Sequence, residues 1–397
     1  MKHLDCKKII QNDYPYIREV AKSRIRYSSV SESFPTSCED IKLRGYFPSK
    51  PQSKEEANFP LAFTFNVYHD YWKVEQYLNL LYAPQNQYCY GIDKKSPQHF
   101  KDKVRNLSKC FSNVYVVEKE YEMKSNGFNG NLYNLECMKI LNKTNYKYLF
   151  LLQNDDAPMK TNRELVEILK IYNGSVDMNF GDPFTAAPIN IRDDISLKFK
   201  DLNIFKEGDE RLKNTSLMES NITLQKGYVE SALPRDAVDY IINNLNITTL
   251  LNTLNSGLPY ADEILWPTIM TSPELQVPGW QHYECSQNIK FSKYFFSRIS
   301  VYYSFCPTNT HRHGLCLLGV ESLSELKSFP HFFGNKFYSN FDAGGSFCWS
   351  EYMYNKKYFK EYSNIRVSLY QESPLIKYQR YKRIEKNLTR VCKLALL

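Results

Sequence analysis

The sequence lacks the short motifs that identify the commonest nucleotide and metal sites. It contains no G-x-G-x-x-G and no G-x-x-x-x-G-K pattern, which excludes a dinucleotide fingerprint and a Walker loop. It contains no C-x-x-C pair, which argues against a zinc ribbon and against a thioredoxin-type redox site. No long basic run with interleaved glycines is present, so nucleic acid is not an expected partner.

Long apolar runs are also missing. No stretch is long enough to form a transmembrane helix, and the first residues, MKHLDCKK, lack the apolar core of a signal peptide. Either a targeting segment is absent from this version of the chain, or the protein does not enter the secretory pathway. Membrane association is therefore expected only through an anchor that this sequence does not contain.

Cysteine, by contrast, is plentiful. Ten cysteines are dispersed over 397 residues, which fits structural disulfides in an oxidising compartment, although scattered buried thiols in a cytosolic protein are the alternative. The net charge of +8 is mild and suits a nucleotide diphosphate as a ligand. Asn-x-Ser/Thr sequons support secretion only weakly in a chain rich in Asn; they occur at Asn106, Asn142, Asn173, Asn214, Asn221, Asn246 and Asn387.

Short apolar runs alternate with helical patterns in the first half of the chain. The runs predict strands over 61–68, 88–92, 113–117 and 146–152, separated by a helix over 71–81, a polar helix after Asp93 that runs through about 107, and a helix over 132–141. This alternation predicts an α/β fold of Rossmann-like type with a mostly parallel sheet. Functional loops are then expected at the carboxyl ends of the strands.

The chain divides into three parts by composition. Residues 1–58 are polar and broken by Pro and Ser, typical of a stem or an irregular wrapping segment. Residues 59–350 form the expected catalytic domain, with irregular surface loops over 190–225 and a helix over 237–254. Residues 351–397 form a basic, Tyr-rich and peripheral tail.

Acidic residues follow two of the expected strands. Asp93 follows the second strand and is placed to hold a uracil or a ribose, or else to cap the next helix before Pro97. Asp155 and Asp156 follow the fourth strand and resemble the acidic pair of metal-dependent glycosyltransferases. Adjacent side chains on extended backbone point apart, so these two carboxylates are not expected to share a metal ion.

Two further segments carry candidate chemistry. Glu263 precedes an apolar, Trp-containing stretch, and is either a general base whose pKa is raised by apolar neighbours or ordinary negative charge at a helix start. Cys306 and Cys316 flank the segment 311–314, which is His-Arg-His-Gly. A disulfide there would present Arg312 to a diphosphate. Zinc is the alternative, although the spacing is compact for four ligands.

Together these segments resemble the core-2/I-branching N-acetylglucosaminyltransferase family. No single motif is decisive, but the order and approximate spacing hold over about 60–350. The matching segments are 61–69, 88–96, 110–114, 135–138, 156–162, 226–235, 262–266, 314–319 and 335–337.

The resemblance implies a GT-A-type nucleotide-sugar fold with inverting, metal-independent transfer and no cofactor beyond the UDP-sugar donor. It implies that Glu263 takes the proton of an acceptor hydroxyl. On the donor side it implies that Lys336 and Arg312 hold the diphosphate, with His313 a rival to Arg312. Asp93 matches the carboxylate on the uridine side, and His69, which ends the first matching segment, is also assigned to the donor site.

The resemblance also implies a set of disulfides, and the sequence departs from the family pattern at one place. The implied pairs are Cys6–Cys348, Cys38–Cys110, Cys89–Cys137 and Cys306–Cys316. Cys285 and Cys392 have no counterpart in the family pattern, and are free or paired together. The family's acceptor-side Trp is missing from 296–303, which leaves the identity of the acceptor open.

The expected function is transfer of N-acetylglucosamine from UDP-GlcNAc to a hydroxyl of an O-glycan, as β-1,6 branching in the Golgi lumen by a type II membrane protein. Other donors of the same family, such as UDP-xylose, remain an alternative. The missing Trp favours a second alternative, a non-catalytic glycan- or nucleotide-binding descendant. A cytosolic nucleotide-binding protein is a third, and it requires reduced cysteines.

Overall fold

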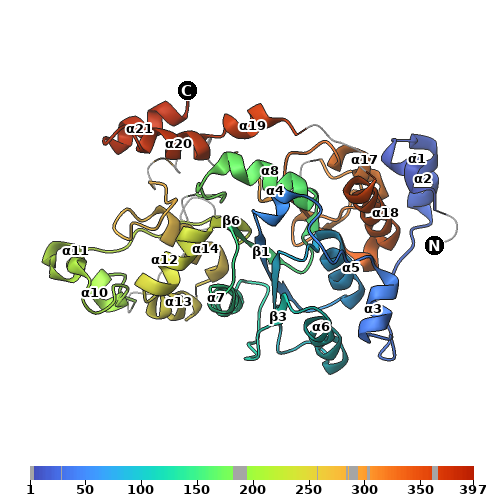
Figure 1. The fold of residues 1–397 in the computed structure, drawn as a ribbon, viewed down its shortest axis with the longest axis horizontal. Coiled ribbons are helices and arrows are strands. Elements are labelled where there is room, and N and C mark those ends of the chain that lie inside the picture. The colour runs from blue at the N-terminus through green and yellow to red at the C-terminus, as the bar shows by residue number, and fades with distance from the viewer. Residues whose placement is uncertain are drawn as a thin grey trace.

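A computed structural model describes residues 4–27, 29–181, 195–256, 258–282, 285, 294–301, 305–359 and 365–397. At its centre lies a five-stranded sheet in the order β3-β2-β1-β4-β6 (Figure 1). Four strands run parallel, namely β1 (Leu61–Val67), β2 (Gln87–Ile92), β3 (Val114–Val116) and β4 (Tyr148–Gln153), and β6 (Ser231–Pro234) is antiparallel to β4. The expected α/β class with a mostly parallel sheet is confirmed.

Helices cover both faces of the sheet, which is why every residue of β1 is buried. Successive side chains of a strand point to opposite faces, so Phe63 and Ala62 enter different clusters. On the side of Phe63 lie α5 (Tyr71–Leu81), α6 (Gln98–Cys110) and α8 (Asn162–Tyr172). On the side of Ala62 lie α7 (Gly130–Leu141), α12 (Arg235–Asn244), α13 (Thr248–Asn255) and α14 (Ala261–Thr271).

The single helix expected over 237–254 is wrong, because the chain forms α12 and α13 instead. Leu245 between them is extended and bridges to Phe205, and the Asn246 amide donates to the Ile204 carbonyl at 2.7 Å. This break lets Leu245 and Ile247 both enter the core, since a continuous helix would turn one of them outward.

The loops expected over 190–225 are partly helical. Residues 190–194 lie outside the described residues, and from 195 onward the chain forms α10 (Phe199–Leu202), the 3₁₀ helix η1 (Glu210–Lys213) and α11 (Thr215–Glu219). Asp209 and Asn214 cap the second and third of these, accepting bonds from the amides of Arg211 and Leu217.

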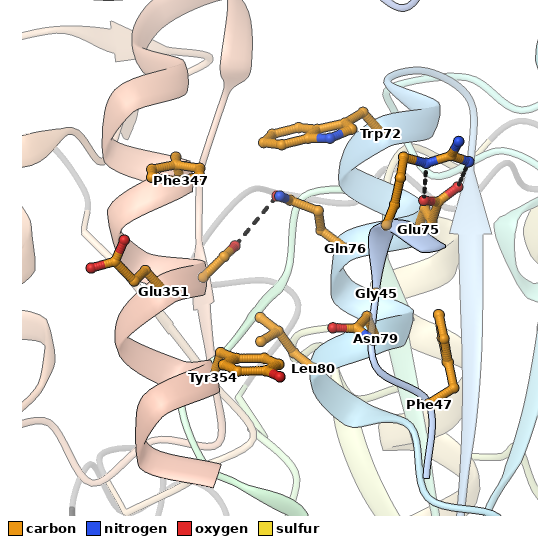
Figure 2. Close-up of a pocket in the computed structure, with 12 residues that line it drawn as sticks. Gly45, Phe47, Trp72, Glu75, Gln76, Asn79, Leu80, Phe347, Glu351 and Tyr354 are labelled. Carbon is orange, nitrogen blue, oxygen red and sulfur yellow. Dashed lines mark hydrogen bonds and ion pairs between the residues drawn. The ribbon is translucent and has the colours of Figure 1, made fainter. Parts of the chain in front are cut away.

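A second sheet, in the order β5-β10-β7, lies beyond the end of β4. Its strands are β5 (Ala157–Pro158), β7 (Arg298–Ser300) and β10 (Phe333–Asn335), and the hairpin β8 (His311–Arg312) with β9 (Leu315–Cys316) is separate. The long helix α18 (Ser339–Tyr358) runs beside α5, and Ser350 Oγ donates to Gln76 Oε1 at 3.3 Å between them (Figure 2). The short helices before α18 are η2 (Val320–Ser322) and α17 (Leu323–Leu326).

Both terminal segments pack on this framework through short helices. At the N-terminal end these are α1 (Cys6–Ile10), α2 (Tyr14–Lys22), α3 (Cys38–Arg44) and α4 (Lys54–Ala57). At the C-terminal end they are α19 (Val367–Gln371), α20 (Pro374–Lys382) and α21 (Leu388–Ala395), which lie along the top of Figure 1. Leu375, Tyr378 and Val391 of this tail are buried in the same cluster as Ala62.

Five disulfides link the chain, and all four implied pairs are confirmed: Cys6–Cys348, Cys38–Cys110, Cys89–Cys137 and Cys306–Cys316. The fifth joins Cys285 to Cys392, so those two cysteines are paired together. Zinc at the 306–316 loop is excluded because its two cysteines are bonded to each other. No helix among the described residues is long and apolar enough to cross a membrane.

Candidate active site

The residues expected on the donor side gather at the carboxyl edge of the parallel strands. His69 follows β1, Asp93 follows β2, and Asp155 follows β4. Lys336 follows β10 of the second sheet, and Arg312 ends β8. Because ligands of open α/β sheets bind at this edge, the strand ends that carry His69, Asp93 and Asp155 lie where a ligand is expected.

Asp155 is the centre of the cationic part of the site. Its Oδ1 is bonded to the buried Lys73 and lies 3.3 Å from His69 Nε2, and its Oδ2 lies 3.7 Å from Lys336 Nζ. Burial opposes the charge of Asp155, but these cations outweigh it and hold the pKa of the carboxyl well below its usual value. Lys73 and Lys336 thus approach Asp155 together with the imidazole of His69, and Lys73 also lies 3.9 Å from Asp70 Oδ2.

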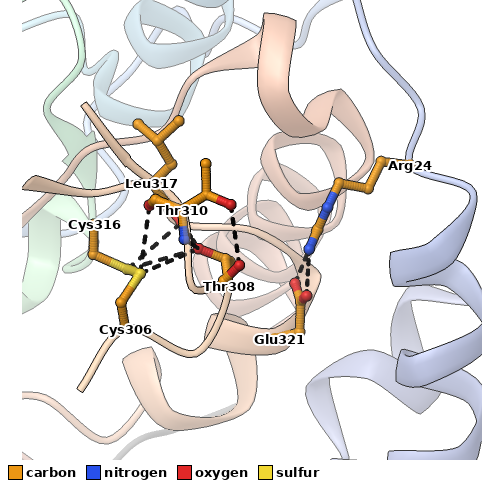
Figure 3. The surroundings of a disulfide bond; sticks show 7 residues. All are labelled: Arg24, Cys306, Thr308, Thr310, Cys316, Leu317 and Glu321. Atoms are coloured by element: carbon orange, nitrogen blue, oxygen red, sulfur yellow. Dashed lines mark hydrogen bonds and ion pairs between the residues drawn. A yellow bond between two sulfur atoms is a disulfide. The ribbon is translucent and has the colours of Figure 1, made fainter.

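Arg312 joins the same region through a disulfide-linked hairpin. Its guanidinium lies over the Tyr338 ring at 4.5 Å, and that ring lies 5.6 Å from the His69 ring. Around the Cys306–Cys316 bond, Thr308 Oγ1 donates to the Leu317 carbonyl at 2.7 Å (Figure 3). His313 is exposed, so the hairpin turns Arg312 rather than its rival towards the donor-side residues.

Asp93 is buried where β2 ends, and its carboxylate organises the loop that follows. Its Oδ1 accepts from the amides of Lys95 at 3.2 Å and Met123 at 3.1 Å. It does not cap α6, whose first turn follows Pro97 without any side-chain cap. The side chain therefore ties the β2 end to residue 123, and a ligand would meet a carboxylate already fixed in position.

Asp156 points away from Asp155, as the sequence predicted for adjacent carboxylates. It accepts from Asn335 Nδ2 at 2.8 Å and from the Gln153 amide at 2.7 Å, and lies 3.5 Å from Arg298 Nη1. Arg298 is also paired with the buried Glu230. No set of three or more His, Cys, Asp or Glu in the part of the chain that the structure describes is arranged to hold a metal ion.

One guanidinium thus faces two buried carboxyl groups. Burial raises the pKa of Asp156, and raises that of Glu230 to about 8, because Arg298 can neutralise only one negative charge. The trio therefore retains one proton at neutral pH. It connects the donor side to the second part of the site, since Arg298 and Glu230 both lie within electrostatic range of Glu263.

Glu263 lies in the first turn of α14 with its side chain 28% exposed. Its Oε2 is 3.3 Å from Lys226 Nζ, and Lys226 in turn lies over the Tyr260 ring at 4.1 Å. Burial raises the pKa of Glu263, and Lys226 opposes this only in part. Asp262 beside it has a pKa raised to about 7 by burial and by the charge of Glu263. A carboxylate with a raised pKa and partial exposure suits proton transfer.

The start of α14 is fixed by the first turn of α7 and by the loop before it. The Tyr260 amide donates to the Asn126 carbonyl at 2.6 Å, and Asn131 Nδ2 donates to the Ala261 carbonyl at 2.9 Å. Gly127 has a φ of +86° and lies against Asp262, whose Oδ1 would be 1.8 Å from an added Cβ. Only glycine fits this contact, so residue 127 helps to set the position of Glu263.

Gly127→Ala is expected to lower kcat of the transfer proposed below by about 100-fold, because Asp262 and the α14 start must move and small displacements of a catalytic group have effects of that order. Gly208→Ala is the matched control: its φ is also +86°, but nothing lies within 4 Å of the added Cβ. It should show only the backbone strain, about 1 kcal/mol in stability. Equal kcat values for the two variants would contradict the role of Gly127.

Several residues of the site were missed by sequence reasoning. Lys73 is a lysine on the apolar face of α5, and Arg298 stands in the segment singled out only for its missing Trp. Residues 302–304 of that segment lie outside the described residues. Lys226 begins the matching segment 226–235, but the sequence assigned no role to it. A buried lysine amid apolar helical spacing was the one usable indication, because such a residue requires a partner.

Fold and site together define a disulfide-linked α/β protein with fixed cations and a carboxyl group of raised pKa at the carboxyl edge of its sheet. Residues 61–327 match the Core-2/I-Branching enzyme family, and the chain belongs to that family of glycosyltransferases. Similar curated proteins include the β-1,3-galactosyl-O-glycosyl-glycoprotein β-1,6-N-acetylglucosaminyltransferases of Bos taurus, Homo sapiens and Bovine herpesvirus 4, each 28% identical. These alignments cover 89%, 89% and 80% of this chain, and 86%, 85% and 73% of those proteins.

Solved structures overlap with this chain only weakly. S. aureus TarS 1-349 is 14% identical over 50% of this chain and 55% of that chain, with a TM-score of 0.25. The S. cerevisiae mannosyltransferase Ktr4p in complex with GDP is 10% identical over 72% and 79%, also with a TM-score of 0.25. At these scores the overlap is too small to support a structural comparison.

Proposed function

We propose that this protein is an inverting, metal-independent glycosyltransferase that moves N-acetylglucosamine from UDP-GlcNAc to a hydroxyl of an O-glycan, forming a β-1,6 branch. The observation that carries the proposal is the placement of Glu263, half-buried with a raised pKa, at the same sheet edge as the cations around Asp155. The relatives named as β-1,6-N-acetylglucosaminyltransferases support the donor and the linkage.

In the proposed reaction Glu263 removes the proton of the acceptor hydroxyl while that oxygen attacks the anomeric carbon of the donor. The bond from that carbon to the diphosphate oxygen breaks, and UDP leaves with its electron pair. Lys336 and Arg312 are the cations assigned to the negative charge that develops on the diphosphate, and His69 lies beside them. Asp93 is assigned to the uridine. The disulfides support a site of action in the secretory pathway, which we assign to the Golgi lumen.

The first experiment is a donor panel. Oxidised protein is incubated with UDP-GlcNAc, UDP-xylose and other UDP-sugars and with mixed O-glycan acceptors, with and without EDTA, and UDP release is measured. The expected result is release from UDP-GlcNAc that EDTA does not change. Release from a different UDP-sugar alone would show that UDP-GlcNAc is not the donor. Loss of release in EDTA would contradict metal independence. No release from any donor would favour a non-catalytic binding protein, the alternative that the missing Trp suggests.

Lys336→Met is expected to weaken binding of the donor specifically. The variant keeps the length of the side chain but loses the ammonium group, so KM for UDP-GlcNAc should rise and kcat/KM should fall by about 100-fold. The matched control is Lys213→Met, whose exposed ammonium pairs with Glu210 on the surface. Steady-state kinetics at varied donor concentration measures both, and unchanged donor kinetics in Lys336→Met would contradict the assignment.

A further inference from the structure

A groove between α5 and α18 lies outside the site described above. It encloses about 280 Å³ and is lined by α5, by α18 and by the segment after α3 (Figure 2). We call it the α5–α18 groove. Four aromatic side chains line it, namely Phe47, Trp72, Phe347 and Tyr354, and its polar lining includes Gln76, Asn79 and Glu351.

The walls of the groove are held in place from both sides. The Cys6–Cys348 disulfide fixes α18 next to Phe347, and the Cys38–Cys110 disulfide fixes the start of α3. At the end of α3, Arg44 forms two 2.8 Å bonds with Glu75 of α5. Because the walls are already linked, a ligand would enter a formed site and would not have to order it.

The side chains offer flat apolar faces beside unused hydrogen-bonding atoms. Figure 2 shows Trp72 and Phe347 on opposite helices at one end of the groove, with Tyr354 and Leu80 together at the other end. Gln76 accepts from Ser350 through Oε1, and its Nε2 donates to none of the described residues. Asn79 donates to the Tyr46 carbonyl at 2.7 Å, and its Oδ1 accepts from none of them.

The charge of the groove selects against anions. Arg44 is neutralised by Glu75, whereas Glu351 is exposed and pairs with no described cation. The net charge of these three residues is therefore negative, and phosphate, sulfate and carboxylate groups would be repelled. Aromatic faces with amide and carboxylate acceptors suit a neutral sugar ring, whose C–H face stacks while its hydroxyls donate. The volume lies below the roughly 300–1,000 Å³ typical of drug-sized ligands, which limits the occupant to about one ring.

We propose that the α5–α18 groove binds one neutral sugar residue of a glycan chain, separately from the catalytic site. The helix α5 divides the two sites, since Lys73 points to Asp155 whereas Trp72 and Gln76 line the groove. The assignment of this glycan to the acceptor rests on the proposed function. The binding of a sugar in the groove is independent of that function.

Saturation-transfer NMR with methyl glycosides of galactose, N-acetylgalactosamine and N-acetylglucosamine tests the proposal, with methyl glucuronide as the charged probe. At least one neutral glycoside should bind with a Kd in the millimolar range, and the glucuronide should bind at least about fivefold more weakly. Tyr354→Ala and Glu351→Ala should each raise the Kd for the neutral glycoside by about fivefold or more. Glu351 is exposed, so its variant tests the groove even if Tyr354→Ala or Trp72→Ala does not fold.

Tyr14→Ala is the matched control, because Tyr14 is a 64% exposed aromatic residue on α2 that does not line the groove. It should leave binding unchanged, and so should Lys336→Met. Binding that is lost in Lys336→Met and kept in Glu351→Ala would place the sugar in the donor site and overturn the proposal, as would no binding of any neutral glycoside. The donor panel on the wild-type protein decides the proposed function separately, so the two can fail independently.

Discussion

Glu263→Gln is expected to fold like the wild-type protein and to lose kcat for glycosyl transfer by about 10²–10⁴-fold. The amide has the shape of the carboxyl group but cannot accept the proton of the acceptor hydroxyl. The ion pair with Lys226 is lost as well, but both groups are partly exposed, so the effect on stability should be below about 1 kcal/mol. UDP release with a saturating donor measures kcat, and thermal unfolding measures the fold.

Glu207→Gln provides the control, because Glu207 is exposed and belongs to the segment between α10 and η1. It should keep full activity. A Glu263→Gln protein that transfers at the wild-type rate would remove the base from the proposed mechanism, even if the donor panel identifies a glycosyltransferase. A variant that binds UDP and does not transfer, with an unchanged melting temperature, is the expected outcome.

The pH profile gives an independent view of the same residue. A general base works only in its ionised form, so kcat/KM should fall as the pH drops through the pKa of Glu263. Burial raises that pKa above the ordinary glutamate value of 4.5, with Lys226 opposing it only in part. The acidic limb is therefore expected above pH 4.5 in the wild type and should be absent from the residual activity of Glu263→Gln. A limb that persists in the variant would assign it to another group.

Arg298→Met is expected to have the largest effect on stability, about 3–5 kcal/mol. Arg298 is 8% exposed and faces Asp156 and Glu230, which are both fully or almost fully buried. Without the guanidinium the two buried carboxyl groups lose the cation that pairs with both, and each must carry a proton or accept the cost of burying its charge. The midpoint of urea unfolding at neutral pH measures the loss.

Glu230→Gln should not lower stability, because burial raises the pKa of Glu230 to about 8, so the carboxyl group must take up a proton on folding at pH 7, whereas the amide need not. Combined with Arg298→Met it should restore part of the lost stability. Arg163→Met is the exposed control, since Arg163 is 54% exposed and pairs with Glu167 on the helix surface. An Arg298→Met protein as stable as this control would show that the trio does not hold the site together.

The strands of the parallel sheet and the first crossover helix were predictable because local pattern and tertiary environment agree there. The run 61–68 is apolar throughout, and β1 is buried on both faces; the apolar spacing of 71–81 matches α5. The prediction over 237–254 was wrong because a contact distant in sequence, Leu245 with Phe205, overrides local helical propensity. The implied disulfides needed the family pattern, since spacing alone leaves many pairings open.

The family resemblance singled out Glu263 as the base, whereas the residue pattern by itself determined the α/β class and the strand ends that carry Asp93 and Asp155. These depend on residue type and on periodicity along the chain, which are local properties. Only the tertiary structure decided which charges meet. Lys73, Arg298 and Lys226 come from a helix, an edge strand and a loop far apart in sequence, and they contact Asp155, Glu230 and Glu263 only after the two sheets pack. The pKa of each carboxyl group follows from that packing, because burial and neighbouring charge are properties of the folded site.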